Sequence, residues 1–446
     1  MRVLALDVGS SSLRARAFDE RARELEGAAR RAYEPRHGRD GSAELDAEEL
    51  VLASRAVLEE ARQGAHDALA ISCFWHSLLL LDAGGRPLTP VLLWEDRRAV
   101  AQAEELARRL DGQRVHDRTG CVLHPSYWPA KLAWLRAERP DVFAGARHAV
   151  SFGDYLFLHL TGELRTSLST ASGTGLLDLR ARTWDAELLD ALGVDAGLLP
   201  PLADDPAGKP PIFPPLGDGA CSNLGAGCTT PERAALMIGT SGAYRIVREA
   251  APEPRAGLFC YFLDNRRIVE GGAVSDGGNL HAWLERTLRL DHAELREPDA
   301  HGLTFLPLLG GERSPGWNPH ATGAVAGLTF RVDPSDLQQA ALEGVTYRLA
   351  EIAETLPEVR EVVATGHALL ASPAWVQLCA DVLGRPVTAS AVPEGSARGA
   401  AVYALERLGA EPDQAPLGRT YEPDPGRAEI YAAARERQRD LYRRLF

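Results

Sequence analysis

The chain has 446 residues, with 49 Lys and Arg against 62 Asp and Glu, and a formal net charge of -13 at pH 7. This acidic balance, without a basic stripe, argues against a nucleic-acid partner. No stretch approaches the roughly 20 apolar residues of a membrane span, and the first residues do not resemble a signal peptide, so we expect a cytoplasmic enzyme without a membrane partner. The length favours two or three domains, and two halves of roughly 220 residues each fit the spacing of a repeated segment.

The six cysteines form no CxxC pair. Metal ligation by cysteine is therefore disfavoured, and a cytoplasmic setting predicts free thiols. We expect buried, small apolar side chains at Cys73, Cys121, Cys221, Cys228, Cys260 and Cys379.

In the first half of the chain, strands and helices are expected to alternate. An alternating hairpin over residues 4–19 is followed by a helix from Asp46 to about Gly64, and then by a buried strand at residues 68–73. Further strands are expected at residues 77–81 and 90–94, and helices near residues 97–110, 129–138 and 154–161.

A stretch rich in Pro and Gly, residues 199–215, marks the expected boundary between lobes of residues 1–216 and 217–446. The second half again begins with a hairpin, over residues 235–247. Strands are then expected at residues 258–263, 267–270 and 359–364, and helices from residue 276 or 277 to about 288, after a Ser335–Gln338 capping box, and from a Ser372 cap to Gly384. This alternation predicts an α/β fold.

The two hairpins share one design. Each has an apolar strand, a turn of Gly with small hydroxyl residues at 9–12 or 239–242, and a returning strand. Such turns present N–H and hydroxyl groups that suit phosphate oxygens. Neither GxGxxG nor GxxxxGK[ST] is present, so the turns are not expected to begin helices. Two ordinary hairpins are the alternative interpretation, but their pairing favours a clamp on a polyphosphate.

Several further segments make the chain resemble the FGGY carbohydrate kinases, within the superfamily of sugar kinases, actin and heat-shock-chaperone ATPases. They are residues 94–98, 217–220, 307–315, 342–345 and 364–386. The resemblance implies a two-lobed, actin-like ATPase fold of the α/β class, each lobe a mixed β-sheet flanked by helices. It also implies an active site in the cleft between the lobes, with ATP and Mg²⁺ as cofactors.

Within the family, residues 75–78, 81–90, 239–243 and 394–400 resemble most the gluconate kinase branch. The implied reaction is transfer of the γ-phosphate of ATP to a hydroxyl of a sugar acid, with gluconate preferred. Xylulose kinases share the His that follows a bulky residue at position 75, so xylulose or another ketose or polyol is the alternative acceptor. A catalytically silent sensor that binds sugar or nucleotide is the alternative of another class. The expected partners are these small molecules, and a homodimer is left open.

The resemblance also implies roles for individual residues. Asp218 is expected to be the catalytic base, the alternative being a turn residue that caps a helix starting near Ala220. Asp7 is expected to hold a hydrated Mg²⁺, the alternative being a cap of its own turn. Arg14 is interpreted either as a phosphate-binding cation or as an exposed strand residue. The predicted nucleotide-binding residues are Gly9, Ser10, Ser11, Ser12, Arg14, Gly239, Thr240, Ser241, Gly242, Gly366 and His367.

Polyols are held by charged hydrogen bonds and by aromatic faces. The predicted sugar contacts are accordingly Trp75, His76, Trp94, Asp96 and Arg97. A gluconate carboxylate would also need a cation or N–H donors, for which Arg97, Arg313 and His124 are the candidates.

The chain departs from the family pattern at a few positions. His367 stands where Gly is usual, which bears on the adenosine pocket. Asn318 replaces Asp, Thr322 replaces Arg and Ser167 replaces Asp. These three positions are interpreted either as structural caps or as signs of a shifted substrate.

Overall fold

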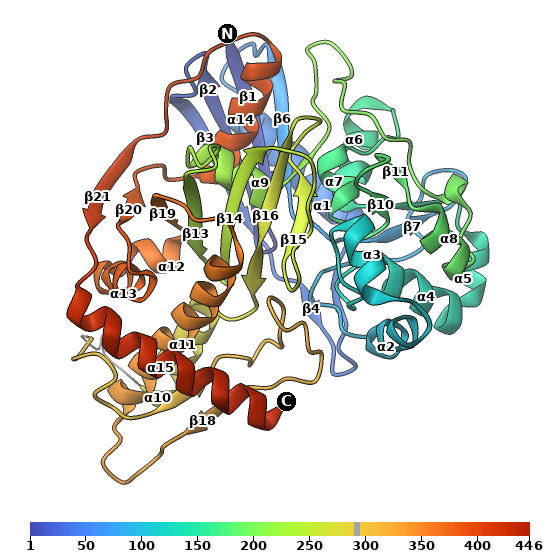
Figure 1. The fold of residues 1–446 in the computed structure, drawn as a ribbon. Coiled ribbons are helices and arrows are strands. Elements are labelled where there is room, and N and C mark those ends of the chain that lie inside the picture. The colour runs from blue at the N-terminus through green and yellow to red at the C-terminus, as the bar shows by residue number, and fades with distance from the viewer. Residues whose placement is uncertain (290–294) are drawn as a thin grey trace.

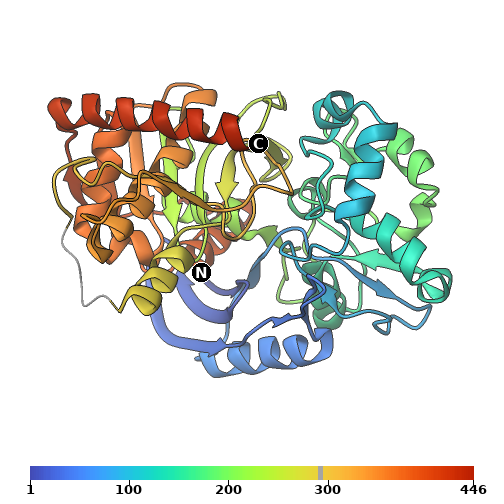
Figure 2. The same cartoon turned by 90° about the horizontal axis from the view of Figure 1, so that it is seen from below.

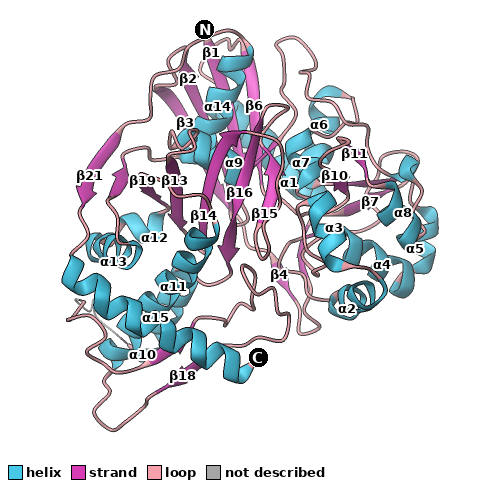
Figure 3. Cartoon of the chain, viewed as in Figure 1, coloured by secondary structure: helices cyan, strands magenta, loops and turns pink. Residues whose placement is uncertain are grey.

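The computed structural model describes residues 1–289 and 295–446. Two mixed sheets form its framework, with helices on their outer faces and between them (Figures 1 and 3). Among the described residues, no helix combines the length and apolar character that crossing a membrane requires.

The first sheet contains the N-terminal hairpin. Its strands follow the order β12 (Leu216–Gly217), β6 (Ala68–Cys73), β1 (Arg2–Val8), β2 (Ser12–Asp19) and β3 (Glu24–Ala32). Strands β1 and β2 are antiparallel and place Asp7 opposite Arg14, while β6 runs parallel to β1. Helix α1 (Ala47–Ala61) covers one face, and the predicted cap at Asp46 is confirmed.

The second sheet repeats this plan. Its strands follow the order β15 (Phe259–Phe262), β16 (Arg267–Val274), β14 (Gly242–Glu249), β13 (Arg233–Ile238), β19 (Glu361–Thr365), β20 (Val387–Ser390) and β21 (Leu417–Tyr421). Strands β13 and β14 form the second antiparallel hairpin, and β19 runs parallel to β13. Both predicted turns therefore connect strands and do not begin helices. Helices α11 (Pro334–Thr355), α12 (His367–Leu370) and α13 (Pro373–Leu383) pack against this sheet.

Two helices lie between the sheets. Helix α14 (Gly395–Arg407) packs against β1 and β6 of the first sheet, and α9 (Asp218–Gly225) packs against β14 of the second. The two helices cross closely, since a Cβ at Gly399 would lie 1.8 Å from the carbonyl oxygen of Cys221. One apolar cluster accordingly contains residues of both sheets and of both helices. A helix from the last quarter of the chain thus completes the core of the first lobe.

The rest of the first half forms a mainly helical region beside the first sheet (Figure 2). Its helices are α2 (Val100–Arg109), α3 (Gly112–Thr119), α4 (Trp128–Glu138), α5 (Pro140–Gly145), α6 (Phe152–Thr161), α7 (Leu168–Ser172), α8 (Ala186–Leu192) and the 3₁₀ turn Ala196–Leu198. Its short strands are β4 (Arg36–His37), β5 (Ala43–Leu45), β7 (Leu79–Leu81), β8 (Val91–Leu92), β9 (His148–Val150), β10 (Leu177–Asp178) and β11 (Thr183–Trp184). The second half adds α10 (Gly278–Leu288), β17 (Thr304–Leu306), β18 (Ala324–Ala326) and α15 (Pro425–Leu445).

The predicted start of α11 at Ser335 is wrong. Asp333 is the N-cap, and its side chain accepts from the Asp336 N–H at 3.0 Å. The Asp336 side chain in turn accepts from the Asp333 N–H. Pro334 occupies the first helical position, where its missing N–H costs nothing, so the helix begins earlier than the spacing suggested. The Ser372 cap of α13 is confirmed, and all six cysteines are free and buried.

Candidate active site

A cavity of about 340 Å³ is lined by residues from both halves of the chain. The first half contributes the predicted sugar contacts Trp94, Asp96 and Arg97. The second half contributes Thr240 and Ser241 of the second turn. His124 and Arg313, two of the three candidate partners for a carboxylate, also line it. The structure thus brings predicted sugar-binding and phosphate-binding residues to one cavity.

Trp75 and His76 do not line this cavity but are buried beside it. A Cβ at Gly217 would lie 1.8 Å from the Trp75 ring, so the indole packs directly against that backbone, and its Nε1 donates to the Ser169 carbonyl at 2.9 Å. His76 adopts a φ of 67°, and its Nδ1 lies 2.6 Å from the Gly173 carbonyl oxygen. Burial, and then the charge of Arg313, lower the His76 pKa well below its usual range, so the imidazole is neutral at pH 7.

These two residues belong to an aromatic cluster. The Trp75 and His76 rings lie 5.0 and 5.8 Å from the ring of Tyr261, and His76 lies 5.0 Å from the ring of Tyr127. The two tyrosine hydroxyls are 2.7 Å apart. Sequence reasoning did not identify the tyrosines, because they come from distant segments.

Asp218 is the first residue of α9 and follows β12 directly. It therefore does not cap a helix at Ala220. Its Oδ1 accepts from the Gly219 N–H at 2.8 Å. Burial raises the pKa of the carboxyl, while the charges of Arg245 and Arg313 oppose the rise. Two arginines thus favour the ionised form that a base requires.

Asp7 is buried at the end of β1. Its Oδ2 accepts from Arg14 Nη1 at 3.1 Å, and its Oδ1 accepts from Ser72 Oγ at 2.8 Å. Burial raises the pKa of Asp7 to about 6, although Arg14 and Ser72 act to lower it. The carboxylates of Asp218 and Glu394 add to the rise. The carboxylates of Asp218 and Glu394 therefore lie near Asp7.

Arg14 is half-buried and paired on both sides. Besides Asp7, it contacts Glu394, with 3.4 Å between Nε and Oε2. The interpretation of Arg14 as an exposed strand residue is therefore wrong. Its role toward phosphate stays a prediction.

The first turn is closed by backbone contacts. The Gly9 N–H donates to the Ser12 carbonyl at 3.0 Å, and the Tyr33 N–H donates to the Ser11 carbonyl at 3.0 Å. The Tyr33 hydroxyl also donates to the Gly9 carbonyl. Ser10 and Ser11 stand in the turn itself, outside the lining of the cavity.

The second turn is fastened to the start of α10. The Gly239 and Thr240 carbonyls accept from the N–H groups of Gly278 and Asn279, at 2.8 and 3.1 Å. Ser275 and Asn279 line the cavity beside Thr240. Sequence reasoning placed a helix here but assigned it no function, although the run Ser-Asp-Gly-Gly-Asn before a helix was a usable signal.

Gly366 has a φ of 91°, and a Cβ there would lie 2.4 Å from the Ile238 carbonyl oxygen. The fold itself thus requires glycine where the chain passes the end of β13. His367 begins α12 and is exposed. Neither residue lines the cavity, and their nucleotide contacts stay predictions.

The three candidate partners for a carboxylate differ. Arg97 is exposed, and its Nη2 donates to the Pro319 carbonyl at 2.5 Å. Burial lowers the His124 pKa to about 3, so this imidazole carries no charge at pH 7. Arg313 lies over the Trp94 ring at 4.7 Å, and its Nε is buried without a hydrogen-bond partner among the described residues. Arg313 is therefore the cation available to a ligand.

Asp96 has a different environment from the one expected of a sugar contact. Its carboxylate accepts from Arg98 Nη2 at 2.6 Å and from the Ala43 N–H at 3.2 Å. These bonds hold the segment that carries Trp94 and Arg97. A supporting role is thus established for Asp96, and a direct sugar contact stays a prediction.

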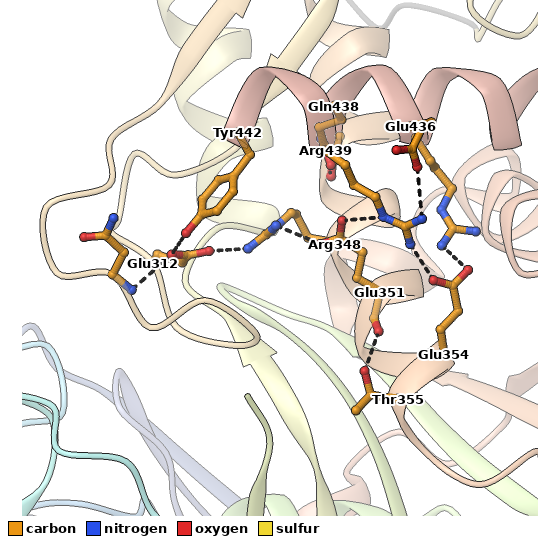
Figure 4. A network of polar contacts seen from close by, with 12 residues as sticks. Glu312, Arg348, Glu351, Glu354, Thr355, Glu436, Gln438, Arg439 and Tyr442 are labelled. Carbon is orange, nitrogen blue, oxygen red and sulfur yellow. Dashed lines mark hydrogen bonds and ion pairs between the residues drawn. The ribbon is translucent and has the colours of Figure 1, made fainter. Parts of the chain in front are cut away.

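The loop that carries Arg313 is fixed by its neighbour Glu312 (Figure 4). Glu312 is buried, accepts from the Tyr442 hydroxyl at 2.6 Å and pairs with Arg348 of α11. Arg348 also pairs with Glu351 at 2.7 Å. Helices α11 and α15 thereby position this side of the cavity.

Two of the departures from the family pattern have structural roles. Ser167 caps α7, its Oγ accepting from the Thr170 N–H at 3.0 Å. The Asn318 side chain accepts from the His320 N–H at 3.0 Å. Thr322 is exposed, and nothing in the structure explains it.

Comparison with known proteins agrees with this geometry. Residues 2–207 match the N-terminal domain, and residues 234–406 the C-terminal domain, of the FGGY family of carbohydrate kinases. A gluconokinase of Bacillus subtilis is 29% identical over 91% of this chain and 88% of its own length. A xylulose kinase of Escherichia coli is 31% identical over 85% of each chain.

A crystal structure of gluconate kinase from Lactobacillus acidophilus superposes with a TM-score of 0.90, at 28% identity, covering 100% of this chain and 98% of that one. The two-lobed α/β sugar-kinase fold is thereby confirmed. The chain belongs to the FGGY family of carbohydrate kinases, phosphotransferases that use ATP to phosphorylate an alcohol group.

Proposed function

We propose that this kinase phosphorylates a sugar acid, with gluconate as the preferred acceptor. The observation that carries the proposal is Arg313, a cation beside the cavity whose Nε is buried and unpaired among the described residues. Burying a polar group without a partner is costly. A hydroxyl oxygen of a neutral acceptor would offset part of this cost, but only through a weaker hydrogen bond that is charged on one side alone. A carboxylate would offset more of the cost through charge-assisted hydrogen bonds.

Asp218 is proposed as the base. Phosphoryl transfer needs an acceptor hydroxyl in line with the γ-phosphate and a group to take its proton. Arg245 and Arg313 favour the ionised carboxylate at this position, which supports the assignment. Trp75, His76, Trp94 and Arg97 would surround the sugar.

The residues around Asp7 fit a magnesium ion that arrives with ATP. Mg²⁺ prefers carboxylate and water oxygens, and Asp7 has the carboxylates of Asp218 and Glu394 nearby. Bound there, the ion would neutralise charge on the phosphates. The turns at 9–12 and 239–242, with Arg14, would bind the phosphates, and Gly366 and His367 would lie toward the adenosine.

We propose that the chain divides into lobes of residues 1–216 and 217–446. Helix α14 belongs to the second lobe by sequence but packs on the sheet of the first. The family domains matched at 2–207 and 234–406 support a boundary between them.

Xylulose is the second candidate acceptor, because xylulose kinases are as similar to this chain as gluconokinases are. An assay coupled to ADP release, run with gluconate, xylulose, ribulose and glycerol, separates the candidates. We expect the highest kcat/KM with gluconate. Turnover of xylulose without turnover of gluconate would replace the proposal, and tight nucleotide binding without any turnover would favour the sensor.

A further inference from the structure

Arg245 of β14 is a buried cation for which the described residues supply no side-chain partner. It is 5% exposed, and its Nε has no hydrogen-bond partner among the described residues. The same ranges contain no ion pair to its side chain. Arg248, on the same strand, shows the ordinary arrangement, since its Nε lies 2.7 Å from a carboxylate oxygen of Glu270. Burying a guanidinium without a partner is costly. We therefore expect a bound ligand to supply the partner of Arg245.

The space for Arg245 is made by glycine. A Cβ at Gly271 would lie 2.9 Å from Arg245 Cγ, and a Cβ at Gly219 would lie 2.9 Å from its Nη1. At Gly219 the same Cβ would also lie 2.6 Å from the Trp75 ring. The guanidinium thus lies beside the residue that follows Asp218, next to the proposed wall of the sugar site.

The contacts at Gly219 place Arg245 beside Trp75, whose ring lies 5.0 Å from the ring of Tyr261. Burial lowers the pKa of Arg245 to about 10, Asp218 opposes this, and the positive charge of Arg313 adds to it. Tyr261 of the aromatic cluster is a further neighbour that affects its titration. Arg245 therefore lies beside the aromatic cluster.

We propose that Arg245 acts with Arg313 as a pair that binds the carboxylate of the acceptor and so determines the preference for sugar acids. The inference rests on the proposed function, which it deepens by naming the residue that distinguishes a sugar acid from its neutral polyol. Guanidinium groups bind carboxylates through two parallel N–H bonds, which gives geometric selectivity as well as affinity.

The test compares wild type with Arg245→Met and Arg245→Lys on two matched acceptors, D-gluconate and D-glucitol. In glucitol a CH₂OH group replaces the carboxylate. We expect Arg245→Met to lower kcat/KM for gluconate roughly 10- to 100-fold more than kcat/KM for glucitol, because any effect of the change on Asp218 falls on both acceptors alike. Arg245→Lys keeps the charge and should recover part of the preference. Arg266→Met, in an exposed turn, is the control that should change neither.

A second measurement does not depend on turnover. Gluconate should raise the Tm of wild type and raise that of Arg245→Met much less. Since methionine removes a buried unpaired charge, the ligand-free variant should unfold no lower than wild type, so loss of folding does not confuse the result.

An equal loss of kcat/KM on both acceptors, with the gluconate-induced Tm shift intact, would overturn the assignment. Arg245 would then act on Asp218 or on the transferred phosphoryl group. Failure of the proposed function is seen separately, in the wild type alone. It would appear as turnover of xylulose or glycerol with no turnover and no Tm shift for gluconate, and it would overturn both proposals.

Discussion

Arg16 and Arg245 occupy equivalent places in the two hairpins, but their surroundings differ. Arg16 lies opposite Ala5 of β1, and Arg245 lies opposite Ala235 of β13, at the same step before each turn. Arg16 contacts the carboxylates of Glu24 and Glu394, whereas Arg245 has no such contact among the described residues. The two hairpins therefore share a topology but differ in charge: within the part of the chain that the structure describes, Arg16 has acidic partners and Arg245 has none.

The opposite difference appears closer to the turns. Asp7 precedes the last residue of β1, and Met237 takes that place on β13. Opposite them lie Arg14 and Ala243. The first hairpin therefore carries the buried acid and its counter-ion, and the second carries apolar side chains. This asymmetry supports a metal site beside the first turn and not beside the second.

The largest effect is expected at Asp218, the proposed base. Asp218→Asn should lower kcat roughly 10²- to 10⁴-fold, because the amide cannot take the proton of the acceptor hydroxyl. Gluconate-induced Tm shifts should persist, since the arginines remain. A purified variant with near-normal kcat would remove Asp218 as the base.

Asp7→Asn should lower activity and raise stability. We expect kcat to fall roughly 10²-fold, because losing one preorganised electrostatic group typically has an effect of this size. The folded-state pKa of about 6 lies above the ordinary value of 3.8, so the ionised Asp7 carboxylate lowers the free energy of unfolding above pH 6. The free energy of unfolding of the variant should therefore exceed that of wild type by up to about 3 kcal/mol at pH 7.5.

That gain should shrink as the pH falls from 6 toward 4, where wild-type Asp7 is itself protonated in the folded state. Urea unfolding at several pH values measures it. Met237→Leu, at the equivalent place of the second hairpin, should show no such pH dependence. A gain that stays constant down to pH 4 would contradict the assigned cause.

Glu312→Gln tests the support of Arg313. The change removes the charge that pairs with buried Arg348, which keeps Glu351, so the free energy of unfolding should fall by about 1–3 kcal/mol. KM for gluconate should rise more than KM for ATP, because the loop with Arg313 loses its anchor. Unchanged acceptor KM would mean that the network supports the fold alone.

The smallest effect is expected at Arg16. Its side chain is 21% exposed and its partners Glu24 and Glu394 are partly exposed, so Arg16→Met should change the free energy of unfolding by about 1 kcal/mol or less. The ratio of kcat/KM for gluconate and glucitol should stay as in wild type. If Arg16→Met changed this ratio as Arg245→Met does, the contrast between the two hairpins would have no functional meaning.

Local patterns identified much of the fold. The Asp46 and Ser372 caps, the strand at 68–73 and the two hairpins follow from signals within a few residues. The start of α11 was misplaced, because Asp333 with Pro334 competes with Ser335 and only the packed helix shows which prevails. The family resemblance, and not periodicity, pointed to Asp7 and Asp218.

The features of the site that could not be predicted from the sequence depend on contacts between residues far apart in the chain. No spacing shows that Ser72 and Arg14 would both bond to Asp7, that Asp96 would be taken by Arg98, or that burial would neutralise His124. In the sequence, Arg245 is an ordinary polar residue of an alternating strand. Only the folded structure shows that Gly219 and Gly271 pack against its side chain, and that no described residue pairs with it.

The position of α14 has a consequence for how the chain is made. The inner face of β1 and β6 is covered by α14, which begins only at Gly395. During synthesis the first sheet therefore leaves the ribosome with an apolar face exposed, and it stays so until α14 has emerged. Folding of the N-terminal part should accordingly finish late, and a ribosome stalled before residue 395 should hold a nascent chain that chaperones bind.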